Sequence, residues 1–125
     1  MLHVQEFDHI VLNVVDVGRS LEWYMGTLGL DGVRVDEWRA GEAPFPSVRV
    51  TTDTIIDLIE GERSGENLNH FCLVVEPGDL DLVRESGEFD VARDNPDQKL
   101  YGARGLATGV YIRDPDGNLI ELRAY

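Results

Sequence analysis

The sequence predicts an α+β fold made of two copies of one βαβββ module. The expected elements run strand, helix and three strands, and the same order then begins again. The segment DHIVLNVVDVGRSLEWYMGTLG also aligns with NHFCLVVEPGDLDLVRESG, since each has an acidic or amide residue, a histidine and an apolar run. A repeat of this length is stronger evidence for the fold than any single strand assignment.

The first module is expected to cover about residues 5–62. Asp16 is a predicted N-cap, apolar residues follow it at helical spacing, and Gly29 suits the end of that helix. The loop RAGEAPFP separates two of the later strands. The expected strands are Phe7–Val14, Val33–Trp38, Ser47–Thr52 and Thr54–Glu60.

The second module is expected to cover about residues 66–125. Its helix, PGDLDLVRESG, has Pro77 at its start and Gly87 at its end. A long loop, NPDQKLYGARGLAT, precedes a final hairpin, and Asp114 and Asp116 fit the turn DPDG better than a calcium loop. The expected strands are Leu68–Val75, Phe89–Arg93, Gly109–Arg113 and Asn118–Arg123.

Length and composition favour one globular domain. The chain has 125 residues, of which 42% are hydrophobic, and no apolar run approaches the roughly 18 residues of a membrane span. The first residues do not resemble a signal peptide, so the cytoplasm is the expected location. The single cysteine, Cys72, has no internal disulfide partner and is expected to pack in an apolar stretch.

The charge is strongly acidic, with 24 acidic against 11 basic side chains and a formal net charge of -13. Such a surface repels nucleic-acid phosphates and anionic membranes, so neither is an expected partner. One hypothesis is adaptation to high salt, which screens the self-repulsion; the alternative is an ordinary acidic protein. A melting temperature that does not rise with added KCl would count against the halophilic hypothesis.

Four polar residues occupy matching places in the two modules. His9 and His70 lie near the start of each first strand, and Asp57 and Glu121 lie within each last strand. The separations agree, since Asp57 follows His9 by 48 positions and Glu121 follows His70 by 51. If a pseudo-twofold axis relates the modules, these side chains converge. Two imidazoles with one or two carboxylates suit a divalent metal such as Fe, Mn, Ni, Co or Zn.

The segments DHIVLNVVDVGRSLEWYMGTLGL, NHFCLVV and YIRDPDGNLIEL resemble the vicinal oxygen chelate superfamily. Its members include glyoxalase I, extradiol dioxygenases and bleomycin resistance proteins. The resemblance covers about Phe7 to Tyr125. It implies a curved eight-stranded, cup-shaped sheet with helices on the outside, a divalent metal inside the cup, a small-molecule substrate and a homodimer.

The resemblance also implies roles for single residues. The family's metal ligands match His9, His70 and Glu121, and its fourth ligand, a Glu in glyoxalase I, matches Asp57. Glu121 and Asp57 are then the expected catalytic carboxylates. An Asp is one methylene shorter, so the alternative for Asp57 is a hydrogen-bond acceptor that orients a ligand imidazole. Glu60 lies off the family register and is the fallback ligand.

Three kinds of function follow from the resemblance. The first is a metal-dependent enzyme that binds vicinal oxygens of a small substrate, with glyoxalase-like lyase or isomerase chemistry favoured over an Fe(II) extradiol dioxygenase, since many ring-cleavage enzymes carry four modules. The second is a binding protein of the bleomycin resistance kind, against which the three ligands argue. The third is thiol transfer to an epoxide antibiotic, which the scarcity of lysine disfavours.

Candidate substrate contacts lie on strands and in the long loop. His3 precedes the first strand, has no counterpart in the repeat and is expected to be solvated. Surface ion pairing is the common alternative for the arginines. The candidates are Arg49, Tyr101, Tyr111 and Arg113.

Overall fold

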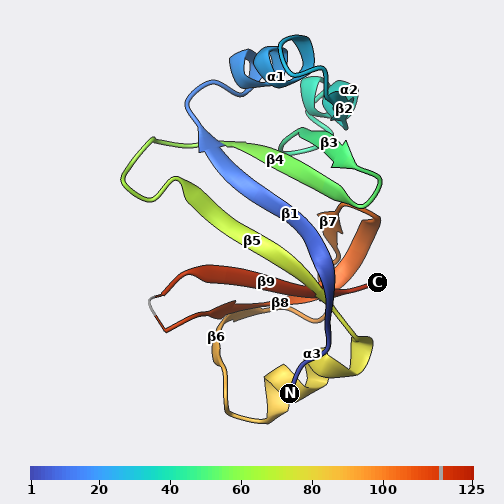
Figure 1. Cartoon of the computed structure of the whole chain (residues 1–125), viewed down its shortest axis with the longest axis vertical. Coiled ribbons are helices and arrows are strands. Elements are labelled where there is room, and N and C mark those ends of the chain that lie inside the picture. Colours follow the sequence, from blue (N-terminus) through green and yellow to red (C-terminus); the bar gives the residue numbers. More distant parts are fainter. Residues whose placement is uncertain (116) are drawn as a thin grey trace. The chain divides into compact units, whose positions relative to one another are not determined.

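The computed structural model describes residues 1–115 and 117–125, in which nine strands and three helices form a mixed α+β fold (Figure 1). This confirms the predicted fold class. The chain divides into two compact units. Unit 1 comprises Met1–His9 with His70–Tyr125, and unit 2 comprises Ile10–Asn69. The first strand, β1 (Val4–Val14), continues from one unit into the other.

Unit 2 contains strands in the order β2-β3-β4-β1, and β2, β3 and β4 pair antiparallel. Asp16 caps α1 as predicted, because its Oδ1 accepts the backbone N–H of Arg19 at 3.0 Å. The helix packs Val17 and Leu21 against Val48 and Leu58 of the sheet. The elements are α1 (Val17–Gly26), β2 (Asp31–Val33), α2 (Val35–Arg39), β3 (Ser47–Thr51) and β4 (Thr54–Glu60).

Unit 1 contains strands in the order β5-β9-β8-β6. Strands β5 and β9 are parallel, whereas β8 pairs antiparallel with β9, β6 and the short β7. The final hairpin lies where the sequence predicts it. Asp116, in its predicted turn, lies outside the described residues. The elements are β5 (Leu68–Val75), α3 (Pro77–Glu85), β6 (Asp90–Asp94), β7 (Leu100–Gly102), β8 (Gly105–Arg113) and β9 (Leu119–Ala124).

The two faces of the unit 1 sheet differ in polarity, because successive side chains of a strand point to opposite faces. One face is apolar and packs against α3. In Figure 1 this helix lies below β8 and β9. On the other face, the register places Arg93 opposite Tyr111, Tyr111 opposite Glu121, and Glu121 beside Cys72. This row crosses four strands and defines the polar face. The buried apolar residues are Val75, Leu80, Val83, Val110, Ile112, Leu122 and Ala124.

The prediction of a strand at Val33–Trp38 is wrong. Arg34 has a φ of 58°, which ends β2, and the helix α2 follows. Val35 and Trp38 both pack on the unit 2 core. Val35 and Trp38 are three positions apart, which suits a helix, whereas Val33 and Val35 are two positions apart, which suits a strand. The apolar pattern of this short run therefore fits both a helix and a strand.

The predicted long loop between Arg93 and Gly109 is partly wrong as well. Within it, β7 pairs with an extension of β8, so that Leu100 lies opposite Ala107 and Gly102 opposite Gly105. This hairpin raises the number of described strands to nine instead of the eight expected. None of the described helices has the length and apolarity that crossing a membrane requires.

Candidate metal centre

Three predicted ligands come together on the polar face of unit 1. The Nε2 atoms of His9 and His70 lie 3.8 and 3.6 Å from Oε1 of Glu121. The two imidazole rings meet edge to face, with centroids 5.6 Å apart. All three side chains are buried, and their ligand atoms lie within 4.8 Å of one another.

This donor set fits one divalent ion. Metal–ligand bonds of about 2.0–2.2 Å allow two ligands of one ion to lie up to about 4 Å apart, so separations of 3.6 and 3.8 Å are compatible with a shared ion. Two imidazole nitrogens and one carboxylate oxygen also form the donor set that borderline divalent metals prefer.

Asp8 fixes the orientation of the first imidazole. Its Oδ2 lies 2.6 Å from Nδ1 of His9 and also accepts the backbone N–H of Ala103 at 2.9 Å. Its Oδ1 accepts the hydroxyl of Tyr125 at 2.6 Å. A carboxylate on Nδ1 favours the tautomer with the proton there, which leaves Nε2 as the acceptor for a metal. Burial raises the pKa of Asp8, but the hydrogen bonds from His9, Tyr125 and Ala103 outweigh it and lower the pKa below its usual value.

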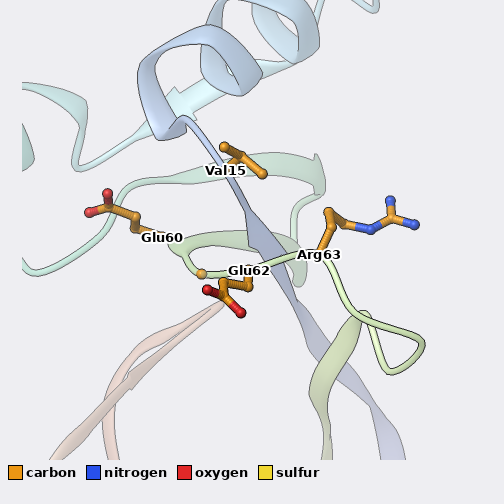
Figure 2. A pocket seen from close by; sticks show the side chains of 5 residues that line it. Val15, Glu60, Glu62 and Arg63 are labelled. Carbon is orange, nitrogen blue, oxygen red and sulfur yellow. The ribbon is translucent and has the colours of Figure 1, made fainter.

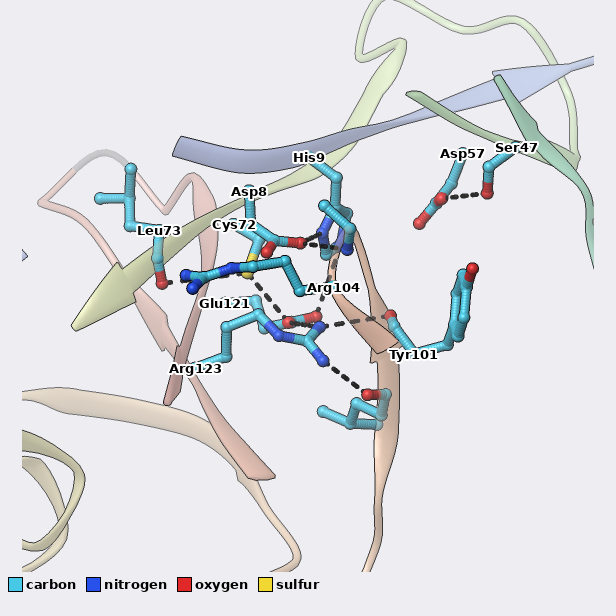
Figure 3. A network of polar contacts seen from close by, with 12 residues as sticks. Asp8, His9, Ser47, Asp57, Cys72, Leu73, Tyr101, Arg104, Glu121 and Arg123 are labelled. Carbon is cyan, nitrogen blue, oxygen red and sulfur yellow. Dashed lines mark hydrogen bonds and ion pairs between the residues drawn. The ribbon is translucent and has the colours of Figure 1, made fainter. Parts of the chain in front are cut away.

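Glu121 is held by donors on both of its oxygens, and Figure 3 shows two of these donors, Cys72 and Arg123, beside its carboxylate. Its Oε1 accepts the hydroxyl of Tyr111 at 2.8 Å. Its Oε2 accepts an N–H of Arg123 at 2.8 Å and the thiol of Cys72 at 3.0 Å. The carboxylate therefore presents Oε1 to the two imidazoles while Oε2 is occupied.

These contacts also fix the protonation states. Burial by itself raises the pKa of Glu121, but the close contact with His70 and the electrostatic interactions with His9 and Arg123 lower that pKa to about 2. Burial and the negative charge of Glu121 raise the pKa of both Tyr111 and the Cys72 thiol. Glu121 is thus a carboxylate at neutral pH, and its two neighbours keep the protons that they donate.

Arg123 connects Glu121 to the β7–β8 hairpin. The side chain is fully buried, and besides Glu121 it donates to the backbone carbonyls of Leu100, Tyr101 and Gly105. Gly102 lies directly against it, since a Cβ at this position would come within 2.4 Å of the guanidinium. The backbone of the hairpin can approach Arg123 only because residue 102 lacks a side chain.

We expect Gly102→Ala to destabilise the protein by about 1–3 kcal/mol, because the added methyl group must displace a guanidinium that is held by four acceptors. Urea unfolding of the metal-free protein measures the change. Gly78→Ala is the matched control, since a Cβ at Gly78 meets nothing within 4 Å and should be neutral or slightly stabilising. Equal stability of the two variants would contradict the close packing described for Gly102.

We expect Asp8→Asn to weaken binding of a divalent metal by about 10–100-fold, the usual effect of losing the partner of a ligand imidazole. Calorimetric titration with Mn²⁺ measures the affinity, and ¹⁵N NMR of the metal-free protein reports the tautomer of His9. Glu6→Gln is the control, because Glu6 is more exposed and pairs with Arg104 instead. A variant with unchanged affinity and an unchanged tautomer would refute the positioning role of Asp8.

Asp57 and Glu60 lie on β4 in unit 2. Oδ1 of Asp57, which is buried, accepts the hydroxyl of Ser47 at 2.5 Å. Glu60 is exposed and lines a surface pocket together with Val15 and residues 61–63 (Figure 2). Since three positions separate them, Asp57 and Glu60 point to opposite faces of the strand. The roles of Asp57 as fourth ligand or catalytic carboxylate stay predictions.

The candidate substrate residues have different surroundings. Tyr111 is buried beside His70, with ring centroids 5.2 Å apart, and touches Glu121. Tyr101 offers its backbone carbonyl to Arg123. Arg113 is half exposed and lies 3.7 Å from Asp90. In unit 2, Arg49 donates to the carbonyl of Thr52 at 3.0 Å. Substrate contact stays a prediction for all four.

His3 is exposed, in line with the expectation that it is solvated, but it also contacts α3. Its backbone N–H donates to Oδ2 of Asp79 at 2.6 Å, and its Nδ1 lies 3.2 Å from Oδ1 of Asp79 and 3.5 Å from Glu76. These contacts attach the start of the chain to the first turn of α3. Asp79 is buried there, and the hydrogen bond from the His3 backbone, which exceeds the effect of burial, lowers the pKa of its carboxyl.

Comparisons with known proteins show the family and the fold of the chain. The model of the Glyoxalase/Bleomycin resistance protein/Dioxygenase superfamily matches residues 6–122. The chain is 27% identical to virulence protein STM3117 of Salmonella typhimurium, over 98% of this chain and 85% of that protein. It is 27% identical to a probable lactoylglutathione lyase of Synechocystis sp., over 91% of each. The Mn(II)-bound glyoxalase from Novosphingobium aromaticivorans shares the fold, with a TM-score of 0.73 and 21% identity over 99% of this chain and 40% of that one.

Proposed function

Since the chain belongs to the Glyoxalase/Bleomycin resistance protein/Dioxygenase superfamily, as its resemblance implied, we propose that it is a metal-dependent enzyme acting on a small substrate through two vicinal oxygens. The convergence of His9, His70 and Glu121 on the polar face of unit 1 carries this proposal. The reaction that we favour is glyoxalase-like lyase or isomerase chemistry.

A divalent metal held there would act as a Lewis acid toward the substrate oxygens. The protein's own groups orient the ligands. Asp8 holds His9, while Tyr111, Cys72 and Arg123 hold Glu121. Preorganised ligands leave little to rearrange when substrate arrives.

Glu121 is suited to the role of ligand rather than of proton shuttle. Its Oε2 already accepts hydrogen bonds from Arg123 and Cys72, so removal of a proton from substrate would require breaking them. Another carboxylate is therefore a better candidate for the group that moves the proton in an isomerase.

Asp57 is the predicted carboxylate for this step, and Asp57→Asn tests it. Loss of turnover with unchanged metal affinity would support a catalytic rather than a ligating role for Asp57.

The lyase relative from Synechocystis supports lyase chemistry, since it covers nearly the same span of sequence. The second candidate is an Fe(II) oxygenase, because two histidines and one carboxylate with open positions are also the facial triad of non-haem iron enzymes. The two candidates differ in their need for oxygen.

Reconstitution separates these functions. Protein purified without a histidine tag is stripped with a chelator and loaded anaerobically with Mn²⁺, Ni²⁺, Zn²⁺ or Fe²⁺. We expect isomerisation of a methylglyoxal–thiol adduct without oxygen in at least one metal form. Turnover of catechols only with Fe²⁺ and O₂ would favour the oxygenase instead. A protein that takes up none of the four metals would overturn both candidates and favour a binding protein.

A further inference from the structure

We propose that Arg93, together with the side-chain amides of Asn95 and Gln98, binds a carboxylate of the substrate whose vicinal oxygens occupy the metal centre. The inference rests on the proposed function and assigns a substrate class to it. The substrates are acids that carry a carboxylate at some distance from the chelating oxygens. The site lies at the edge of unit 1, where β6 pairs with β8.

The sheet register puts Arg93 on the polar face. Arg93 lies directly opposite Tyr111, which lies directly opposite Glu121. Opposite residues of paired strands point to the same face, and neighbouring strands lie about 4.8 Å apart. The backbone of Arg93 is therefore about 10 Å from that of Glu121. A ligand of moderate length can contact both the metal centre and Arg93.

The guanidinium of Arg93 lies on a fixed platform. Its central carbon is 4.2 Å from the ring centroid of Tyr111. That ring is held at its hydroxyl by Glu121 and at its side by His70. A guanidinium stacked on an aromatic ring keeps in-plane N–H groups for a planar carboxylate.

Arg93 differs from the other arginines of unit 1 in its partners. Among the residues that the structure describes, each of the other four arginines has a carboxylate within 4.0 Å, whereas Arg93 has none. Nearby Asp94 pairs with Arg84 instead. The chain has a net charge of -13, yet Arg93 lies near the candidate metal centre and has no carboxylate partner. Arg93 is therefore suited to bind an anionic ligand. The other four are Arg84, Arg104, Arg113 and Arg123.

A small cleft marks the place where the carboxylate would bind. The cleft itself has a volume of about 10 Å³, which is room for about one water molecule, so the carboxylate would lie at its mouth against the exposed guanidinium of Arg93. The side chain of Leu100 packs beside Gly109, where a Cβ would lie 3.3 Å from Leu100 Cδ1. The carboxamides of Asn95 and Gln98 line the same cleft and offer hydrogen-bond donors beside the guanidinium. The lining residues are Arg93, Asn95, Gln98, Leu100, Gly109 and Tyr111.

The test compares chelators with and without a carboxylate on the Mn²⁺-loaded protein. The probes are catechol, 3,4-dihydroxybenzoate, 3,4-dihydroxyphenylacetate and 3-(3,4-dihydroxyphenyl)propionate, titrated by calorimetry. We expect at least one acid to bind about ten-fold more tightly than catechol, because a bidentate charged hydrogen bond is added. Arg93→Met should abolish this preference while the affinities for Mn²⁺ and catechol stay unchanged. Arg19→Met, the control at an exposed arginine of α1, should keep the preference.

A titration of the metal-free protein tests the carboxylate site independently of the metal. Benzoate is added to ¹⁵N-labelled protein, and a saturable shift of the Arg93 Nε–H resonance is expected. Two results would overturn the inference. In the first, the wild-type protein binds none of the acids more tightly than catechol. In the second, the Arg93→Met protein still binds the acid more tightly than catechol. If Mn²⁺ does not bind at all, the proposed function fails. The benzoate titration then tests the carboxylate site by itself, and a constant Arg93 Nε–H resonance would refute that site.

Discussion

His70→Ala lowers the affinity for divalent metal by more than the roughly 10–100-fold that loss of an outer partner produces, because it removes one of three ligands that converge on a shared point. The change leaves the Glu121–Arg123 ion pair in place, so the fold should persist. Calorimetric titration with Mn²⁺ measures the loss. Added imidazole should restore part of the affinity by filling the vacated position.

His3→Ala is the matched control for that loss. His3 is the remaining histidine outside the centre and lies with Glu76 and Asp79, a group that itself offers three ligand atoms. The affinity of the His3 variant should equal that of wild type. If it falls as far as in His70→Ala, Mn²⁺ binds at the start of α3, and the assignment of the centre is wrong.

Arg123→Met should destabilise the metal-free protein by about 3–5 kcal/mol, because removing one partner of a buried ion pair leaves the other charge uncompensated. The change also removes the donors to three backbone carbonyls of the β7–β8 hairpin. Urea unfolding measures the free energy. The double variant with Glu121→Gln should regain part of the loss, since the uncompensated carboxylate is then gone.

Arg113→Met is the comparison for this effect. Arg113 is half exposed and lies 3.7 Å from a carboxylate that is itself mostly exposed, so its removal should change stability by no more than about 0.5 kcal/mol. If Arg123→Met is equally mild, the buried network contributes little to stability.

The convergence of the three candidate ligands was predictable because it depends on pattern. His9, His70 and Glu121 occupy matching strand positions in a repeated sequence, and a sheet converts such positions into a shared face. Strand alternation also put Cys72 and Arg123 on that face, two residues from His70 and Glu121. The signal for Arg123 was therefore present in the sequence, although an arginine in a strand more often reaches solvent.

The supporting contacts were not predictable from local pattern. Asp8 receives hydrogen bonds from Ala103 and Tyr125, which lie 95 and 117 positions away along the chain. Strand alternation would place Asp8 on the face opposite to its neighbour His9, yet its carboxylate reaches the imidazole. Arg93 was missed because its partner is a ring on the adjacent strand rather than a charge.

Pulsed EPR of the protein titrated with Mn²⁺ tests the metal centre most directly, because nuclear modulation from coordinated imidazole nitrogen reports which side chains hold the ion. We predict a single class of Mn²⁺ with two histidine nitrogens, of which His9→Ala and His70→Ala each remove one and His3→Ala removes none. Manganese bound without imidazole nitrogen, or with a signal that only His3→Ala abolishes, would contradict the account.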